Sequence, residues 1–503
     1  MDRPTGKTED ATVETEAGRL KGLAQDGVSA FRGIPYATAA RWQMPQLAPP
    51  WAGIRDATRF GPVSPQGAMR MATLSGGPVG AQSEDCLNLN VWTPGCDNAK
   101  RPVMLWLHGG AFVFGAGSQG IYDGRRLAAR DVVVVTINYR LGAFGFLALD
   151  DATDGRAPGT GAEGIADQIL ALTWVKQNIA CFGGDPDNVT VFGESAGAMS
   201  VNALLASPAA QGLFHKAIAQ SGGGHIGHDR ERAARVARTL LDTLGIAPAD
   251  ARRLLDIPFP ALVEAQGALL AGARAGRYRL GGLPFQPAVD NATLPLRPID
   301  AVRAGAAKGI PLLTGTTREE WKLFTALDPR LRFMSVRNLS QRVTRLAHDV
   351  APALLAAYEE GSPFTRFTAL MTDKAFTMPA TRLLEAQAAH APAYAYRFDW
   401  RSRLLGGMFG SCHALELGFV FGTHDDKRAG LFFGKGPAAD ALSATMIDAW
   451  TAFARTGDPG WPRYDTHSRE TMIFGDGPPR AAAAPDEARR KVWDAFPDRK
   501  LGP

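Results

Sequence analysis

The chain has 503 residues, of which 45% are hydrophobic and 21% are charged, and these are ordinary proportions for a globular protein. They exclude a disordered chain, which would hold too few apolar residues for a core, and the lack of a glycine repeat excludes a collagen-like fibre. The formal net charge is +5, from 55 basic and 50 acidic residues. Without a long run of lysine or arginine, this balance predicts no nucleic-acid partner.

The sequence also predicts a cytoplasmic protein with no membrane partner. The first ten residues contain no apolar stretch of the kind that forms a signal peptide. The most apolar segment, residues 132–149, is interrupted by Asn138 and Arg140, which argues against a membrane span. Four cysteines without a C-x-x-C pair are too few for a disulfide scaffold, which fits a reducing compartment.

From the N-terminus onward, the pattern changes from hairpin-like to an alternation of strands and helices. Residues 11–31 alternate in polarity and turn like an antiparallel hairpin. Short apolar runs predict buried strands at residues 103–107, 132–137, 189–192, 217–220, 311–313 and 393–398. Longer helical patterns such as residues 164–178 separate these runs, and alanine-rich stretches at 229–244 and 438–455 predict helices outside the sheet.

This alternation predicts the α/β class. We expect a mainly parallel central sheet with an antiparallel N-terminal edge, helices on both faces and helical insertions. The sequence contains no repeat, no low-complexity linker and no sharp boundary in composition. We therefore expect residues 1–503 to form one domain.

The sharpest local motif is Gly193-Glu194-Ser195-Ala196-Gly197, which matches G-x-S-x-G. A β-branched run leads straight into it and small residues follow, as a strand–turn–helix element requires. The two glycines leave room for a sharp turn that lifts the serine hydroxyl clear of the backbone. Ser195 is therefore the predicted nucleophile, although the same motif also occurs in ordinary glycine-rich loops.

A serine hydroxyl is a weak nucleophile and needs a base, an orienting acid and donors for a developing oxyanion. The segment His108-Gly109-Gly110-Ala111-Phe112 follows a buried strand, as an oxyanion loop of the HGGG type does. We expect the N–H groups of Gly109, Gly110 and Ala111, with that of Ala196, to surround a carbonyl oxygen as it becomes negative.

Further motifs, in order along the chain, resemble the type-B carboxylesterase family, whose α/β-hydrolases include bacterial p-nitrobenzyl esterases and, more distantly, cholinesterases. They lie at residues 31–37 (FRGIPYA), 84–92 (EDCLNLNVW), 138–142 (NYRLG) and 182–186 (FGGDP). The resemblance implies the α/β-hydrolase fold and a serine carboxylic-ester hydrolase that works through an acyl-enzyme intermediate.

The resemblance places the orienting acid at Glu320, which follows a predicted strand and keeps the chain order serine, acid, histidine. Glu319 is the adjacent alternative. The family usually has glycine after this acid, where this chain has Trp321. The base is placed at His413, in a segment that matches the family's histidine loop. His424 is the alternative, and two aspartates after it favour a solvated turn.

The resemblance also implies a supporting network and part of a substrate pocket. Glu194, Ser221 and Glu416 match buried positions behind the family's catalytic residues, where a carboxylate would favour a protonated histidine. The residues expected to line the pocket are Phe112, Trp321, Met69 and Met71. The ion pairs expected to be structural are Arg41 with Glu84 and Arg140 with Asp167.

The loop from Ser64 to Ser83 bears on substrate charge. In cholinesterases the corresponding loop carries a tryptophan whose face holds the substrate cation, whereas this loop contains no Trp, Tyr or Phe. We therefore expect the substrates to be neutral small-molecule esters rather than choline esters.

No cofactor or metal is expected. Metal-ligand spacing such as H-E-x-x-H does not occur in the sequence, and the G-x-G-x-x-G match at residues 115–120 belongs to the oxyanion loop. Two alternatives to ester hydrolysis remain: cleavage of an amide, carbamate or lactone by the same residues, and a non-catalytic adhesion or scaffold role. The expected assembly is a monomer or weak homodimer.

Overall fold

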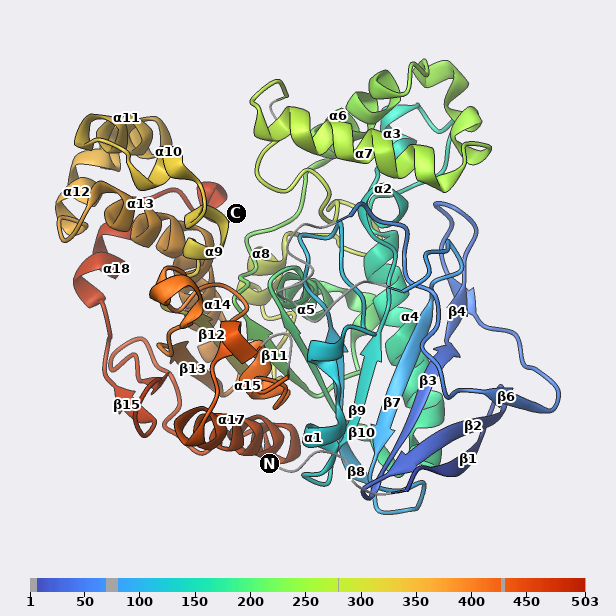
Figure 1. Cartoon of the computed structure of the whole chain (residues 1–503). Helices are drawn as coiled ribbons and strands as arrows, with labels where there is room; N and C mark the ends of the chain where they lie inside the picture. The colour runs from blue at the N-terminus through green and yellow to red at the C-terminus, as the bar shows by residue number, and fades with distance from the viewer. Residues whose placement is uncertain (1–6, 69–79, 279, 427–429, 503) are drawn as a thin grey trace.

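The computed structural model describes residues 7–68, 80–278, 280–426 and 430–502. It has the predicted α/β class, with one large mixed sheet and helices around it (Figure 1). All predicted strands are present. The three predicted helices correspond to α4 (Glu163–Asn178), α6 (Arg230–Thr243) and α17 (Pro437–Thr456).

The sheet is parallel in its middle and antiparallel at both edges. Its strands are β1 (Glu9–Thr15), β2 (Gly18–Gln25), β3 (Val28–Pro35), β6 (Ile54–Asp56), β7 (Asn88–Thr93), β8 (Arg101–Leu107), β9 (Val133–Ile137), β10 (Gly184–Glu194), β11 (Lys216–Gln220), β12 (Leu312–Thr317), β13 (Ala393–Phe398), β14 (Thr471–Phe474) and β15 (Arg480–Ala482). Their order is β1-β2-β3-β7-β9-β8-β10-β11-β12-β13-β14-β15, with β6 beside β2. Neighbours from β9 to β14 pair in parallel, whereas β1, β2, β3 and β7 form the predicted antiparallel edge. The antiparallel strand β15 at the far edge was not predicted.

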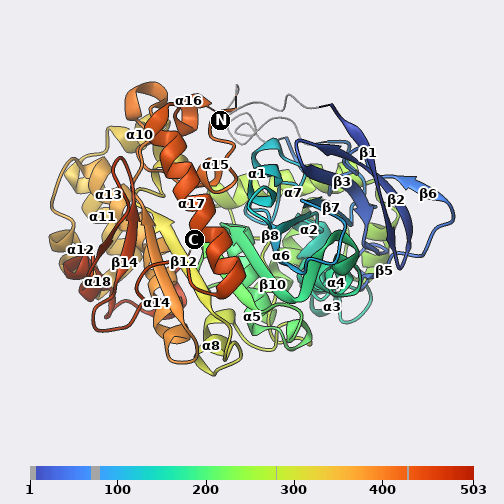
Figure 2. The ribbon, with the colours of Figure 1, turned by 90° about the horizontal axis from the view of Figure 1, so that it is seen from below.

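Side chains of the central strands alternate between two hydrophobic cores. In β8, Leu105 and Leu107 join the core that includes α4 and α5 (Ala196–Ala206), whereas Met104 and Trp106 join the core that includes α17. Figure 2 shows α4 and α5 on one side of the sheet and α17 on the other. Because both faces are covered, these strands contain runs of apolar residues that do not alternate with polar ones, and these runs made the strands predictable.

Two groups of helices extend beyond the upper end of the sheet in Figure 1. The first contains α6 and α7 (Phe259–Arg274) and follows β11. The second contains α10 (Pro329–Arg332), α11 (Val336–Ala347), α12 (Ala351–Ala357) and α13 (Pro363–Thr372) and follows β12. The second group has a core of its own, which it shares with α18 (Glu487–Trp493). These are the predicted helical insertions, and they leave the sheet where parallel strands end.

The turn between β10 and α5 is packed too tightly for a side chain at Gly197. A Cβ atom there would lie 1.9 Å from the carbonyl oxygen of Leu107, and β8 is held between two neighbouring strands. We predict that Gly197→Ala lowers the free energy of unfolding by about 1–3 kcal/mol, because the added carbon overpacks the core. The urea midpoint of the purified variant measures this loss.

Gly267→Ala is the matched control. Gly267 is an exposed residue of α7, and no described atom lies within 4 Å of the position that its Cβ would take. Alanine favours a helix over glycine, so this variant should gain up to about 1 kcal/mol. Equal midpoints for the two variants would contradict the packing argument.

Candidate active site

Ser195 occupies a strained turn at the carboxyl end of β10. Its backbone has φ 56° and ψ −121°, a conformation that side chains rarely tolerate outside functional sites. The Ser195 N–H donates to the carbonyl oxygen of Gln220 in β11 at 2.9 Å, and the Ser195 carbonyl accepts from Met199 at 2.9 Å. The residue is half-buried, and its hydroxyl has no hydrogen-bond partner in the described part of the chain. In free hydrolases the bond from serine to base is often long and shortens when substrate binds.

Glu320 and His413 form a buried pair. Glu320 Oε2 lies 2.6 Å from His413 Nδ1, and Glu320 Oε1 accepts from the Thr317 N–H at 2.8 Å. The His413 N–H also donates to the Glu320 carbonyl oxygen at 3.3 Å. Because both carboxylate oxygens are engaged, Glu320 fixes the orientation of the imidazole and leaves Nε2 as the ring nitrogen that has no hydrogen bond within the described residues.

The two alternative residues point elsewhere. Glu319 pairs with Lys322 and accepts from the Ser411 N–H at 3.0 Å. Burial would raise the pKa of Glu319, but the charge of Lys322 and the hydrogen bonds from Lys322 and the Ser411 N–H together outweigh it and lower that pKa. His424 is not in a solvated turn as the sequence suggested: it is fully buried, stacks on Phe419 and bonds to Asp440 Oδ1 at 2.9 Å.

The predicted oxyanion loop lies directly against the serine. A Cβ atom at Gly109 would be 3.1 Å from Ser195 Cβ, so the loop backbone packs directly on Ser195. Gly110 and Ala111 have positive φ values of 119° and 54°. The N–H groups of Gly109, Gly110, Ala111 and Ala196 donate to no other described residue. They are therefore free to donate to a ligand.

A shell of polar contacts fixes this loop. The Tyr139 hydroxyl donates to the His108 carbonyl at 2.7 Å, and its ring stacks on the His108 imidazole with centroids 4.5 Å apart. Gln66 bonds twice to Gly115, donating to its carbonyl at 3.0 Å and accepting from its N–H at 2.8 Å. The donors are thus held in place before any ligand arrives.

Two further carboxylates lie buried near the serine and the histidine. Glu194 Oε1 is 3.1 Å from His413 Nε2 but lacks the alignment of a hydrogen bond. Glu416 Oε1 accepts from Gln220 Nε2 at 3.1 Å, while Glu416 Oε2 and Ser221 Oγ have no partner among the described residues. The three predicted supporting residues are all buried, yet no hydrogen bond joins them to one another in the described part of the chain.

These carboxylates change the acidity of the site. Burial raises the pKa of Glu194 and of Glu416 above the usual carboxyl range. Burial alone would lower the pKa of His413, but the negative charges of Glu194 and Glu320 outweigh it and raise that pKa. Negative charge around the ring therefore favours the imidazolium that forms when His413 accepts a proton.

Three aromatic rings beside His413 form what we call the aromatic wall: Trp321, Phe324 and Phe376. The centroids of Phe376 and Phe324 lie 4.7 and 5.3 Å from that of the imidazole. Trp321 packs on Phe324 at 5.2 Å and on Phe376 at 6.3 Å. Only Trp321 was predicted. Phe324, three residues later in α9 (Lys322–Thr325), could have been inferred from helical spacing, whereas Phe376 comes from a distant segment with no local signal.

Phe376 lies in the π-helix η6 (Asp373–Thr377), an element that often marks functional sites. Gly502 donates its N–H to the Lys374 carbonyl at 3.0 Å, and Lys374 Nζ donates to the Gly502 carbonyl. The Tyr358 hydroxyl donates to Asp373 and accepts from Trp493 Nε1 at 2.7 Å. Residues near the end of the described chain therefore hold one side of the aromatic wall.

The remaining predicted pocket residues add nothing to this wall. Phe112 is fully buried in the hydrophobic core, where it packs edge-to-face on Phe146 with centroids 4.9 Å apart. We therefore leave it out of the pocket. Met69 and Met71 lie outside the described residues.

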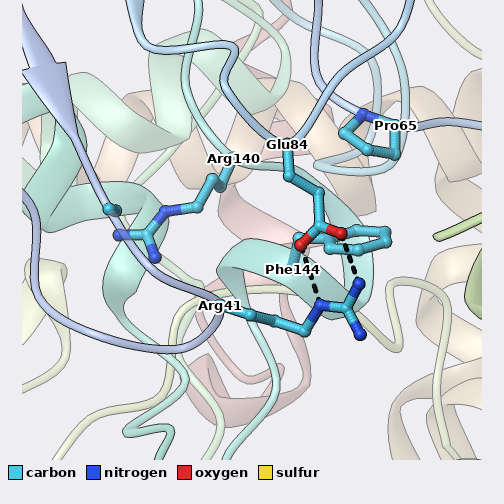
Figure 3. A pocket seen from close by; sticks show the side chains of 6 residues that line it. Arg41, Pro65, Glu84, Arg140 and Phe144 are labelled. Atoms are coloured by element: carbon cyan, nitrogen blue, oxygen red, sulfur yellow. Dashed lines mark hydrogen bonds and ion pairs between the residues drawn. The ribbon is translucent and has the colours of Figure 1, made fainter. Parts of the chain in front are cut away.

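Both expected ion pairs are present and support neighbouring loops. Figure 3 shows the Arg41 guanidinium turned toward Glu84, with Arg140 and Phe144 close by. Arg41 Nε and Nη2 both donate to Glu84, the former at 2.8 Å, and Arg41 Nη1 donates to the carbonyls of residues 254, 255 and 257. The buried pair of Arg140 Nη2 with Asp167 Oδ1 measures 2.7 Å. Each cation is matched by its own acceptors, so these pairs hold structure.

Comparison with known proteins agrees with this geometry. The model of the Carboxylesterase family matches residues 9–493. The chain belongs to this family. It is 41% identical over 485 residues to the para-nitrobenzyl esterase of Bacillus subtilis, covering 92% of this chain and 94% of that protein. It is 34% identical over 489 residues to the phenmedipham hydrolase of Pseudarthrobacter oxydans, covering 92% and 95% of the two chains. The carboxylesterase EST55 of Geobacillus stearothermophilus superimposes with a TM-score of 0.85 at 41% identity, covering 96% and 99%.

Membership decides the general activity and the fold. This carboxylesterase is a serine hydrolase of ester bonds with the α/β-hydrolase fold, as predicted. The non-catalytic role and the other acyl bonds are not favoured. Within the described residues, no helix is both long and apolar enough to cross a membrane, and no group of three or more His, Cys, Asp or Glu side chains is arranged to hold a metal ion.

The charge of Glu194 should set the acid side of the pH profile. With His413 as the base, kcat/KM should fall as the pH drops through the pKa of His413, because only a neutral imidazole can accept a proton. Because the raised pKa of His413 depends on Glu194, Glu194→Gln should lower that pKa and move the acid limb to lower pH by about 1 unit. Steady-state kinetics between pH 5 and 9 measure the shift.

Two control variants accompany this measurement. Glu194→Asp keeps the charge and should keep the limb near its original position. Glu319→Gln removes a carboxylate that pairs with Lys322 instead of the histidine and should also leave the limb in place. If the acid limb of Glu194→Gln lies at the same pH as that of the parent enzyme or at a higher pH, the electrostatic role of Glu194 is contradicted.

Proposed function

We propose that Ser195, His413 and Glu320 are the nucleophile, base and orienting acid of this carboxylesterase. The observation that carries the proposal is the contact of Glu320 Oε2 with His413 Nδ1 at 2.6 Å. The other ring nitrogen, His413 Nε2, lies 3.1 Å from Glu194 Oε1, and Glu194 directly precedes the strained Ser195. Ser195 follows β10, Glu320 follows β12, and His413 lies in the loop after β13. The three residues thus keep the chain order serine, acid, histidine.

In the proposed reaction, Ser195 Oγ attacks the ester carbonyl carbon while His413 Nε2 takes the hydroxyl proton. The carbonyl oxygen becomes negative and accepts hydrogen bonds from among the N–H groups of Gly109, Gly110, Ala111 and Ala196; each such donor is worth about 3–4 kcal/mol of barrier. The intermediate collapses, the C–O bond to the alcohol breaks, and the alcohol leaves with the proton from His413.

Water completes the cycle. His413 takes a proton from a water molecule, whose oxygen attacks the acyl carbon bound to Ser195. The second intermediate breaks the bond to Ser195 Oγ, which recovers the proton from His413, and the carboxylic acid departs. In both halves the imidazolium forms transiently, and the buried Glu194 and Glu416 favour it. Ser221 and Gln220 line the same buried region as positioning residues.

We further propose that the substrates are neutral esters with a flat apolar group that packs on the aromatic wall. The wall offers ring faces next to the base, and such faces contribute about 0.5–1.5 kcal/mol per aromatic contact beyond their area. The loop from Ser64 to Ser83 lacks the aromatic residue that cholinesterases use for a cation.

The setting of the enzyme is part of the proposal. Four free cysteines, Cys86, Cys96, Cys181 and Cys412, support a reducing, cytoplasmic location. Both large cores share the one sheet, which supports a single catalytic domain over residues 1–503. The proposed assembly is a monomer or weak homodimer, and nucleic acid is not among the proposed partners.

Ser195→Ala should abolish ester turnover without unfolding the protein, because it removes only the nucleophilic oxygen. The expected loss is about 10⁶-fold, as is typical of such serines, measured with p-nitrophenyl acetate alongside the circular dichroism spectrum. An organophosphate should label Ser195 stoichiometrically in the parent enzyme. Retention of more than about 1% of activity would refute the assignment.

The two histidines provide a matched comparison. His413→Ala should lose turnover as severely as the serine variant, since the proposed reaction needs His413 to take the serine proton. His424→Ala should retain most turnover, because His424 bonds to Asp440 and stacks on Phe419. Comparable losses in both variants would contradict the assignment of His413.

Substrate charge is tested with a choline ester and its neutral isostere, 3,3-dimethylbutyl acetate. We expect kcat/KM for the choline ester to exceed that for the isostere by less than about tenfold, or about 1.4 kcal/mol. A larger preference for the cation would refute the proposal and point to the face of Trp321. In that case Trp321→Ala should remove the preference while sparing the neutral ester.

A further inference from the structure

The stretch of residues 324–336 exposes an unusual amount of apolar surface. Of the twelve large apolar side chains that are exposed in the described part of the chain, four come from these thirteen residues. They are Phe324 (51% exposed), Leu327 (64%), Phe333 (84%) and Val336 (60%). Exposed apolar side chains are normally scattered singly, so a concentration of this kind indicates a surface that contacts something. We call residues 324–336 the apolar segment.

The apolar segment lies in strongly basic surroundings. Residues 322–347 contain six basic residues and one acidic residue, a net +5 that equals the formal charge of the whole chain. The exposed arginines are Arg330, Arg332, Arg337, Arg342 and Arg345. In α11, Leu339, Val343 and Ala347 are buried against the neighbouring helices, so the helix turns its basic side toward solvent. Exposed basic and exposed apolar side chains therefore follow one another along residues 324–345.

This surface is continuous with the candidate active site. Phe324 is half-exposed, yet its ring lies 5.3 Å from the imidazole of His413 and parallel to the ring of Phe376. The chain then runs without a long connection through α10 and into α11. Whatever covers the apolar segment is thus adjacent to the aromatic wall.

We propose that the apolar segment docks on the surface of an anionic phospholipid membrane and brings membrane-dissolved esters to Ser195. The proposal rests on the proposed function of Ser195. Exposed aromatic and aliphatic side chains enter the headgroup region, while nearby arginines are attracted by anionic lipids. This occupant departs from the sequence-based expectation of no membrane partner, which considered only a spanning segment. A second copy of the chain fits poorly, because a symmetric contact would bring two basic surfaces together.

Vesicle sedimentation tests the docking. The probes are vesicles of equal parts phosphatidylglycerol and phosphatidylcholine, with pure phosphatidylcholine vesicles for comparison. The enzyme should sediment with the anionic vesicles and remain largely in solution with the neutral ones, and high salt should release it. Phe333→Ser should weaken binding by about tenfold. Arg330→Gln and Arg337→Gln should each weaken it by about fivefold.

Ile54→Ser is the matched control, because Ile54 is equally exposed (57%) but belongs to β6 at the opposite end of the sheet. It should bind like the parent enzyme. Failure of the parent to bind anionic vesicles, or equal losses in Phe333→Ser and Ile54→Ser, would overturn the proposal. So would a dimer in solution that Phe333→Ser dissociates, because the apolar segment would then contact a second copy.

Two readouts separate docking from chemistry. Ser195→Ala should bind anionic vesicles as well as the parent enzyme does, while losing turnover. Phe333→Ser should hydrolyse soluble p-nitrophenyl acetate at the parental rate, yet lose at least severalfold in turnover of a long-chain p-nitrophenyl ester dissolved in anionic vesicles. Loss of turnover of the soluble ester in Phe333→Ser would instead place this residue in the catalytic pocket and refute a docking role.

Discussion

The backbone strain at Ser195 is the constraint around which the site is built. A residue with φ 56° and ψ −121° costs of order 1–3 kcal/mol and persists only where its surroundings enforce it. Here β10 is clamped between β8 and β11, the Ser195 N–H is bonded to Gln220, and Gly109 packs on Ser195 Cβ. Ser195, the proposed nucleophile, is therefore positioned by the sheet itself, and the same turn presents the N–H of Ala196 beside it.

Buried charge is the second constraint. The buried carboxylates differ in how many hydrogen bonds they accept, and this difference sets their roles. Both oxygens of Glu320 are engaged, one by His413 and one by the Thr317 N–H, so this group is held in place and orients the ring. Glu194 and Glu416 each keep an oxygen without a hydrogen bond, so their desolvation is less well compensated. Their influence is electrostatic, and it is strongest when His413 carries a positive charge.

Sequence patterns predicted those parts of the molecule whose structure is set by residues that are neighbours in the chain. The strand-to-turn motif around Ser195 and the buried apolar runs are of this kind. The polar strand β7 was missed because its asparagines resemble a loop, yet Asn90 is buried and bonds to Thr136 across the sheet at 3.0 Å. His424 was misjudged because its acidic neighbours suggested solvent, whereas Phe419 and α17 cover it. Phe376 required knowledge of tertiary contacts.

The π-helix that carries Phe376 is held by residues near the end of the described chain, which affects when the aromatic wall can form during synthesis. Its residue Lys374 exchanges backbone and side-chain hydrogen bonds with Gly502, and Tyr358 joins Asp373 to Trp493. The turn at Ser195 and the loop of residues 108–112 lie in the first half of the chain and can form on the ribosome while the rest is being made. The aromatic wall beside His413 gains its contacts with Trp493 and Gly502 only when residue 502 has emerged, so the nascent chain carries Ser195 long before the wall is fully supported.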